Sequence, residues 1–173
     1  MSNKRKRVGI IPYSFDDQGK DVVLLGKERG AKWSPFAGGL EANETLQEGA
    51  VREFVEEING FFSRSEIMPL VNDDNKIVIN YSYSISYYYI IDLYYDPVLP
   101  GYFKNVSDYF TSLANGRKDQ WGTPILCDTC EGALEKEEIK WFRLEDFVQM
   151  STDQVFNTFN RDTTKLLNKL TRK

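Results

Sequence analysis

The alternation of apolar and polar residues predicts most of the strands in this chain. Residues 8–15 and 22–25 are apolar, and turn-forming residues 16–19 separate them, so the two runs predict a β-hairpin. The longest alternating stretch, residues 77–95, places tyrosine and aliphatic side chains on one face and serine and asparagine on the other. This stretch exceeds an ordinary strand, so we predict either one long bent strand or two strands joined by a tight turn. A late strand is predicted at residues 139–142.

Helical spacing of apolar residues predicts one strong helix, residues 45–58, between the two strand regions. Its apolar stripe comprises Leu46, Ala50, Phe54 and Ile58, widened by Val51 and Val55. Asn43 or Thr45 is expected to cap its start, and Asn59-Gly60 to close it. Further helices are predicted over residues 106–114, 144–150 and 154–170. The order of strands, helix, strands and helices predicts a single mixed α/β domain over residues 1–173.

Composition is typical of a folded globular domain. Hydrophobic residues make up 41% and charged residues 28% of the 173 residues. The net charge of −4 gives no global attraction to nucleic acid or to anionic membranes. The sequence contains neither a bilayer-spanning apolar run nor a signal peptide pattern, so we expect a cytoplasmic protein without a membrane partner. The basic run from Lys4 to Arg7 predicts a flexible, solvated leader over residues 1–7, with an RNA contact or a nuclear address as the alternatives.

The absence of histidine narrows the chemistry that the chain can perform. Ser-His-Asp and Cys-His catalysis are excluded, so acid–base steps must use carboxylates, lysine, tyrosine or a metal-bound water. Cys127 and Cys130 form a single CxxC, whereas a structural zinc site needs four ligands. We therefore expect these cysteines to be reduced thiols that are dispensable for activity.

Three glutamates share one face of the predicted helix. Glu53, Glu56 and Glu57 follow i, i+3, i+4 spacing, at which each like-charged pair costs an isolated helix ~0.2–0.5 kcal/mol. A bound cation would turn this repulsion into coordination, and Mg²⁺ prefers such oxygen ligands. Gly38 allows the backbone to approach a metal or phosphate closely, and Arg52 is placed to hold a carboxylate. On the three glutamates alone, a solvated acidic helix face is an equal alternative.

Residues 38–60, GGLEANETLQEGAVREFVEEING, resemble the Nudix box, G-x5-E-x7-R-E-U-x-E-E-x-G-U, in which U is a bulky apolar residue. The matching residues are Gly38, Glu44, Arg52, Glu53, Phe54, Glu56 and Glu57. Asn59 and Gly60 replace the final glycine and the final apolar residue of the box. This departure concerns the closing turn of the helix and leaves the acidic residues unchanged.

The resemblance implies a three-layer α/β/α sandwich around a mixed sheet. It also implies a hydrolase that cuts a phosphoanhydride bond in a nucleoside-diphosphate-linked substrate. In this reading Mg²⁺, or Mn²⁺ in its place, is held by Glu53, Glu56, Glu57 and the Gly38 carbonyl. Arg52 and Glu44 keep the helix and its carboxylates in place. The general base varies in such proteins, and the candidates here are Glu53, Glu131, Glu135 and Glu137.

Substrate contacts lie outside the box and are harder to predict. Lys27, Arg29 and Lys32 precede it and are candidate phosphate ligands, with a solvated loop as the alternative. Trp33 or Trp121 is a candidate to stack on a base, although Trp33 also suits a buried position. A small nucleotide is the expected substrate. The alternatives are decapping of capped RNA and a non-catalytic Nudix-like binding module, in a monomer or a homodimer.

Overall fold

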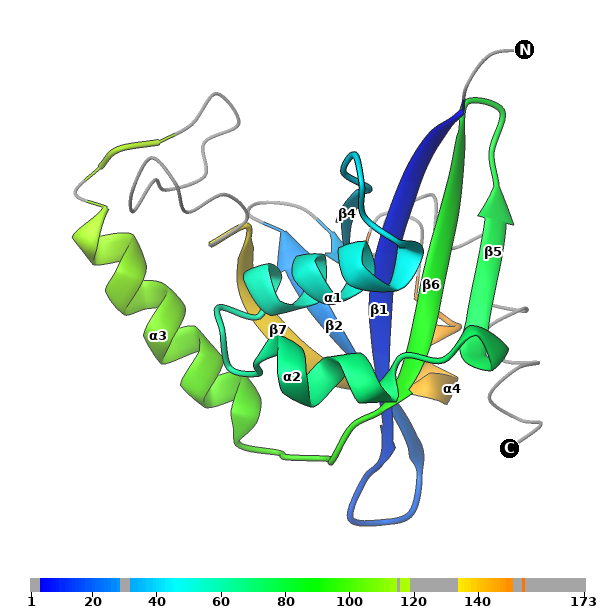
Figure 1. Ribbon diagram of the computed structural model, residues 1–173. Coiled ribbons are helices and arrows are strands. Elements are labelled where there is room, and N and C mark those ends of the chain that lie inside the picture. Colours follow the sequence, from blue (N-terminus) through cyan, green and yellow to red (C-terminus); the bar gives the residue numbers. More distant parts are fainter. Residues whose placement is uncertain (1–3, 29–31, 115, 119–133, 151–153, 155–173) are drawn as a thin grey trace.

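A mixed β-sheet forms the centre of the protein, and helices cover both of its faces (Figure 1). The computed structural model describes residues 4–28, 32–114, 116–118, 134–150 and 154. Within these residues the strands are β1 (Arg5–Phe15), β2 (Asp21–Glu28), β3 (Trp33–Ser34), β4 (Phe36–Gly39), β5 (Lys76–Asn80), β6 (Ser84–Asp92) and β7 (Lys136–Arg143). The sheet runs in the order β3-β2-β1-β6-β5, with β4 also paired to β1 and β7 to β2. β1 and β6 are parallel, and the other pairs are antiparallel.

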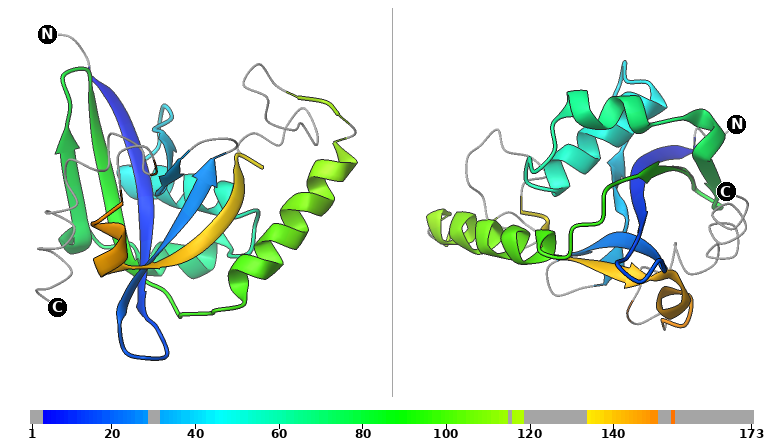
Figure 2. Two further views of the ribbon diagram at one scale, coloured as in Figure 1. Left: turned by 180° about the vertical axis from the view of Figure 1, so that it is seen from behind. Right: turned by 90° about the horizontal axis from the view of Figure 1, so that it is seen from below.

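The helices of the described residues are distributed over the two faces of this sheet (Figure 2). They are α1 (Leu46–Glu57), α2 (Arg64–Ile67), α3 (Leu99–Leu113) and α4 (Leu144–Phe147), with 3₁₀ turns at Met68–Leu70 and Asp73–Asn75. Buried residues of α1, α2 and α3 form one hydrophobic cluster with the sheet, and buried residues of α4 belong to a second cluster on the other face. The predicted α/β/α arrangement around a mixed sheet is confirmed. No helix in the described part of the chain is long and apolar enough to cross a membrane.

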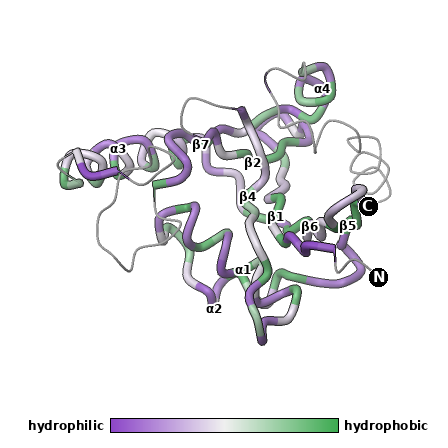
Figure 3. Tube along the Cα trace, turned by 90° about the horizontal axis from the view of Figure 1, so that it is seen from above, coloured by the Kyte–Doolittle hydropathy of each residue, from purple (hydrophilic) through white to green (hydrophobic). Residues whose placement is uncertain are grey.

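The helix predicted from residue 45 to residue 58 is confirmed as α1. Thr45 caps its start in a reciprocal capping box with Glu48, and Asn43 stands before it with a left-handed φ of 73°. Asn59 and Gly60 close the helix with φ values of 53° and 70°, so the departure from the box still provides the left-handed turn. Polar and apolar residues alternate along α1 and α3 (Figure 3), because each helix buries only one side.

The stretch from residue 77 to residue 95 forms two strands, the second of the predicted alternatives. A turn at residues 81–83 joins β5 to β6, and it is closed by the Tyr81 N–H donating to the Ser84 carbonyl at 2.8 Å. Both faces were expected to be buried at Tyr88, Ile90 and Tyr94; Tyr88 and Ile90 are buried, whereas Tyr94 lies beyond the end of β6 and is exposed. Ser84 and Ser86 were expected on a polar face, but both are buried, because this face carries a cavity rather than open solvent.

Two element boundaries differ from the predictions. Residues 5–7 were expected in a flexible leader but belong to β1, in which Arg5 pairs with Ser84 and Arg7 pairs with Ser86 and Gly39. β4 and β6 lie on either side of this segment and pair with it. The basic run contains no apolar residues, so its sequence does not predict a strand. Helix α3 begins seven residues earlier than predicted, because Pro100 lies in its first turn, where proline is favourable and not a break. Of the predicted terminal helix over residues 154–170, only residue 154 is among the described residues.

Candidate active site

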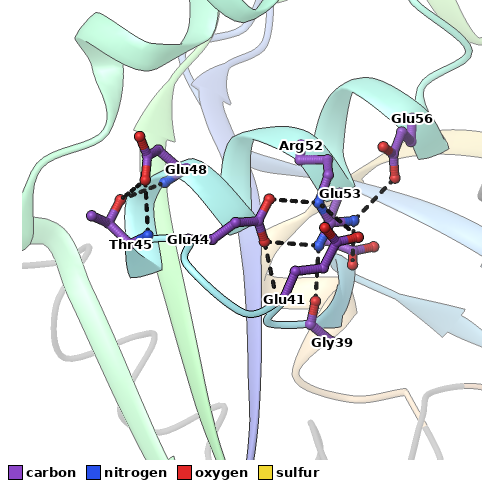
Figure 4. A network of polar contacts seen from close by, with 8 residues as sticks. All are labelled: Gly39, Glu41, Glu44, Thr45, Glu48, Arg52, Glu53 and Glu56. Atoms are coloured by element: carbon purple, nitrogen blue, oxygen red, sulfur yellow. Dashed lines mark hydrogen bonds and ion pairs between the residues drawn. The ribbon is translucent and has the colours of Figure 1, made fainter.

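Arg52 is the centre of a polar network that joins the loop before α1 to the acidic face of that helix (Figure 4). Its Nε and Nη2 donate to both carboxylate oxygens of Glu44, at 2.8 and 3.1 Å. Nη1 donates to Glu53 Oε1 at 3.0 Å and to Glu56 Oε2 at 3.2 Å, and Nη2 also donates to the Gly39 carbonyl at 2.9 Å. The guanidinium holds the pKa of Glu44 below its usual range. Arg52 and Glu44 therefore lie where the resemblance implied, as the clamp of loop and helix.

Glu53 lies directly against the Gly38 backbone. A Cβ placed on Gly38 would come within 2.3–2.4 Å of the Glu53 carboxylate atoms, so no side chain fits there without displacing that carboxylate. Glu53 is nearly buried, whereas Glu56, one turn later on the same face, is about one-third exposed, at 31%. The carboxylates of Glu53 and Glu56 thus share one guanidinium group and differ in their access to solvent.

Glu57 is buried on the other side of the cluster, with both oxygens engaged. The Ala37 backbone N–H donates to Oε2 at 2.8 Å, and the Lys136 ammonium lies 3.3 Å from Oε1. The side chain of Lys136 is completely buried. Sequence reasoning placed Glu57 in the site but missed Lys136, because a lysine in an acidic stretch gives no sign of burial.

The three box glutamates form a donor set suited to a hard divalent cation. Burial raises the pKa of Glu53 and Glu56, opposed by Arg52. Burial likewise raises the pKa of Glu57 well above its usual range, opposed by Lys136. A divalent ion would relieve this cost, so the residues fit the ion chemically. Among the described residues no three acidic side chains converge as a closed metal cage; Arg52 pairs with Glu53 and Glu56, and Lys136 pairs with Glu57.

A cavity of about 230 Å³ adjoins this cluster on the face of the sheet that carries Ser84 and Ser86. Its lining residues are Arg7, Glu28, Ser34, Pro35, Ala37, Tyr81, Tyr83, Ser84, Ser86 and Tyr88. Arg7 Nη2 donates to the Ala37 carbonyl at 3.1 Å, so the guanidinium is fixed at the wall between cavity and cluster. The aromatic residues of this lining are Tyr81, Tyr83 and Tyr88. In the sequence, only the strand alternation at residues 81–88 pointed to them.

Comparisons with known proteins place the chain in a family. A family model described as the NUDIX domain matches residues 3–166. The chain belongs to the NUDIX domain family. No curated protein is similar enough in sequence to count as a relative. The expectation of a Nudix pyrophosphohydrolase that acts on phosphorus-containing anhydrides is confirmed.

Solved structures share the Nudix fold at low sequence identity. An Ap4A hydrolase of C. elegans, in a binary complex, is 16% identical over 98% of this chain and 99% of its own, with a TM-score of 0.57. The NUDIX domain of Shewanella oneidensis NrtR, complexed with ADP ribose, is 15% identical over 99% and 89%, with a TM-score of 0.56. A bifunctional NMN adenylyltransferase/ADP ribose pyrophosphatase of Francisella tularensis, complexed with AMP and a Mn ion, is 15% identical over 99% and 42%, with a TM-score of 0.59.

The candidate bases that follow the Nudix box are Glu131, Glu135 and Glu137, and the structure describes the last two. Glu135 is exposed, and its charge contributes to raising the pKa of both Glu53 and Glu57, which places it beside the cluster. Glu137 instead pairs with Lys27 at 3.3 Å. Glu131 lies outside the described residues. Glu135 and Glu53 therefore remain the two candidates that the described residues bring to the Nudix carboxylates.

The predicted substrate residues that the structure describes, Lys27, Lys32 and Trp33, do not line the cavity. Lys27 forms ion pairs with Glu137 and, at 3.9 Å, with Glu138. Trp33 packs edge to face on Phe142, with ring centroids 4.8 Å apart, so it serves the core of the Nudix sheet. Lys32 is half-buried and is likewise absent from the lining. Three predictions, those for Arg29, Trp121 and the cysteine pair Cys127 and Cys130, lie outside the described residues.

Proposed function

We propose that this protein hydrolyses a phosphoanhydride bond in a nucleoside-diphosphate-linked substrate with the help of a divalent ion, Mg²⁺ or Mn²⁺. The observation that carries the proposal is the unbroken set of box carboxylates on α1, clamped by Arg52 and joined through the Ala37 N–H to the wall of a cavity. Glu53, Glu56, Glu57 and the Gly38 carbonyl would hold the ion. When bound, such an ion polarises the phosphate and lowers the pKa of a coordinated water.

The residues of the chain supply the positions and the proton transfer. Arg52 fixes Glu53 and Glu56 relative to the loop that carries Gly38, so that the donors are arranged before a substrate arrives. Glu135 would accept the proton of the attacking water, because it is exposed and lies beside Glu53 and Glu57. Glu53 is the alternative base.

The cavity beside the cluster would bind one moiety of the substrate. Its volume of about 230 Å³ is smaller than the roughly 300–1,000 Å³ of pockets for a whole drug-sized ligand, so it suits a nucleobase or a ribose. Tyr81 and Tyr83 offer aromatic faces, and Arg7 offers a fixed cation towards the phosphates. Two similar structures hold ADP ribose and AMP, which is consistent with a nucleotide in this class of site.

Capped RNA is the second candidate substrate, because the basic residues 4–7 lie against the site. Lys4 Nζ donates to the Tyr81 carbonyl at 2.7 Å, and Arg5 pairs with Ser84 at the end of the cavity. Basic side chains on a strand beside a cavity could bind the first phosphates of an RNA chain. We still favour a small nucleotide, because the net charge is −4 and Lys27 is paired with acidic residues.

We expect activity to require a divalent ion and Mn²⁺ affinity to rise with pH. The pKa values of Glu53, Glu56 and Glu57 are raised, so protons compete with the ion as the pH falls through these values. The stability of the metal-free protein should change in the opposite direction and fall as the pH rises. The raised carboxyl pKa values favour the folded state at low pH, and this contribution is lost as the carboxyl groups ionise. Mn²⁺ titrations and thermal unfolding in EDTA, from about pH 5 to about pH 8, test both signs. Full turnover after exhaustive EDTA treatment would contradict the metal site.

We expect small nucleotides to be cleaved better than capped RNA, and Arg7→Met to raise KM for them by about tenfold. The panel comprises ADP ribose, Ap4A, nucleoside triphosphates and capped RNA, each with Mg²⁺ and with Mn²⁺. Lys104→Met is the matched control, because it removes a positive charge from α3, where Lys104 pairs with Asp108. The decapping alternative replaces our proposal if capped RNA gives the higher kcat/KM and substitution of Lys4 and Arg5 removes that advantage. Nucleotide binding without turnover of any substrate would favour the non-catalytic module.

A further inference from the structure

Lys136 places a completely buried ammonium group beside the proposed metal site. Its three N–H groups have three oxygen partners: Ser34 Oγ at 2.7 Å, Glu28 Oε1 at 3.3 Å and Glu57 Oε1 at 3.3 Å. The opposing carboxylates raise the pKa of Lys136 against the effect of burial, so the group stays charged. This buried cation is therefore a member of the polar network around Glu57.

The strand geometry is adapted to seat this side chain. β2 and β7 pair regularly up to Lys27 and Glu138, and the register then shifts so that Glu28 faces Lys136. Such a bulge re-aims a side chain out of the regular alternation. Gly26 leaves the space for the lysine stem, because a Cβ there would lie 2.8 Å from the Lys136 Cδ and 2.9 Å from its Cγ.

Glu57 is the partner that depends most on this cation. Glu57 is 2% exposed, whereas Glu28 is 34% exposed and can be solvated without the lysine. A buried carboxylate without a compensating charge is strongly destabilised, and removal of one partner of a buried ion pair costs far more than a surface ion pair contributes. Lys136 therefore acts on Glu57 above all, while its contacts with Glu28 and Ser34 connect it to the wall of the cavity.

We propose that Lys136 is a resident cation of the site: a positioning residue that holds Glu57 beneath the Ala37 N–H and supplies there a positive charge that balances this carboxylate when the divalent ion is absent. The inference rests on the proposed function for the presence of that ion. It implies that Mn²⁺ and the Lys136 ammonium partly substitute for each other in balancing the carboxylates. A lysine that served packing alone would have no such relation to the metal.

Thermal unfolding of the full chain tests this proposal, in EDTA and in saturating Mn²⁺. Lys136→Met keeps the length of the stem but removes the charge, and we expect its Tm in EDTA to fall by roughly 10 °C. Mn²⁺ should then raise the Tm of Lys136→Met more than that of the wild type. Lys140→Met is the matched control on the same strand, since Lys140 is exposed and lies over the ring of Phe142, and its Mn²⁺ response should equal that of the wild type.

A double variant separates the charge pair from packing. Lys136→Met combined with Glu57→Gln leaves neither charge unpaired, so its Tm in EDTA should exceed that of Lys136→Met alone. The proposal is overturned if the double variant is no more stable than Lys136→Met, or if Mn²⁺ raises the Tm of Lys136→Met and of the wild type equally. Should the wild type bind no Mn²⁺ in a direct titration, the proposed function fails instead, and the double variant still decides whether Lys136 positions Glu57.

Discussion

Glu56→Gln is expected to lower kcat on the order of 10²–10³-fold while leaving the fold unchanged. Glu56 is the most exposed of the three box glutamates, and Arg52 is the only hydrogen-bond donor to its carboxylate among the described residues. A glutamine keeps an oxygen for Arg52 but removes a charge that the proposed divalent ion needs. The loss of repulsion from Glu53 also offsets any small loss of stability, by ~0.2–0.5 kcal/mol. Steady-state kinetics and thermal unfolding of the purified variant measure the two effects.

Glu48→Gln on the same helix is the matched control for Glu56→Gln. Glu48 forms the capping box with Thr45, and its carboxylate accepts the Thr45 backbone N–H at 2.8 Å. This substitution should therefore lower stability by ~0.5–1 kcal/mol and leave kcat within a few-fold of the wild type. If Glu48→Gln loses stability but keeps its kcat, and Glu56→Gln keeps its stability but loses kcat, the loss of turnover arises from the site and not from a weakened helix. Wild-type turnover by Glu56→Gln would refute the assignment of this face to metal binding.

Glu57 shows that the helix pattern alone could not distinguish the roles of the three glutamates. Spacing on α1 placed Glu53, Glu56 and Glu57 on one face and gave no reason to distinguish them. In the structure Glu57 is buried against Lys136 and the Ala37 N–H, whereas Glu56 reaches solvent. Glu57→Gln would thus leave a buried ammonium short of a partner and cost stability as well as turnover. The difference arises from β7, which is distant in sequence, and no local pattern in α1 contains it.

The local signals predicted the framework well. Apolar periodicity identified α1, the β1–β2 hairpin and β7, because these elements bury one regular face against the sheet. The box glycine at residue 38 and the clamp at Arg52 were also predicted, since their spacing is specific to the motif. These features depend on residues within about twenty positions of one another, which is the range that a motif spans.

The cavity could not be predicted, because its walls combine distant segments whose local patterns suggest other roles. Arg7 belongs to a basic run that resembles a solvated leader, and it becomes a wall residue only because β4 and β6 pair with β1 on either side. Ser84 and Ser86 are small and polar, so alternation assigned them to solvent, although they are buried beside the cavity. Lys27 and Trp33 stood near the box in sequence, yet one is paired with Glu137 and the other with Phe142.

Arg52→Met is expected to lower both stability and turnover. The side chain is 11% exposed, and its guanidinium satisfies Glu44, Glu53, Glu56 and the Gly39 carbonyl. Its removal leaves partly buried carboxylates without a partner, so we expect a loss of about 3 kcal/mol in the free energy of unfolding. The kcat should fall by about 10–100-fold, because the carboxylates that would hold the ion lose their positioning. Denaturant titration and kinetics with saturating Mn²⁺ measure the two losses.

Arg52→Lys and Arg143→Met distinguish the clamp from a simple charge effect. Lysine keeps the charge but lacks the planar fork that reaches both oxygens of Glu44 and the Gly39 carbonyl together, so Arg52→Lys should regain part of the stability and little of the turnover. Arg143→Met removes a more exposed arginine that pairs with Asp16 at 3.0 Å and should cost no more than about 1 kcal/mol with unchanged kcat. If Arg52→Lys matched the wild type in kcat, a single positive charge would suffice, and the clamp would not be what positions Glu53 and Glu56.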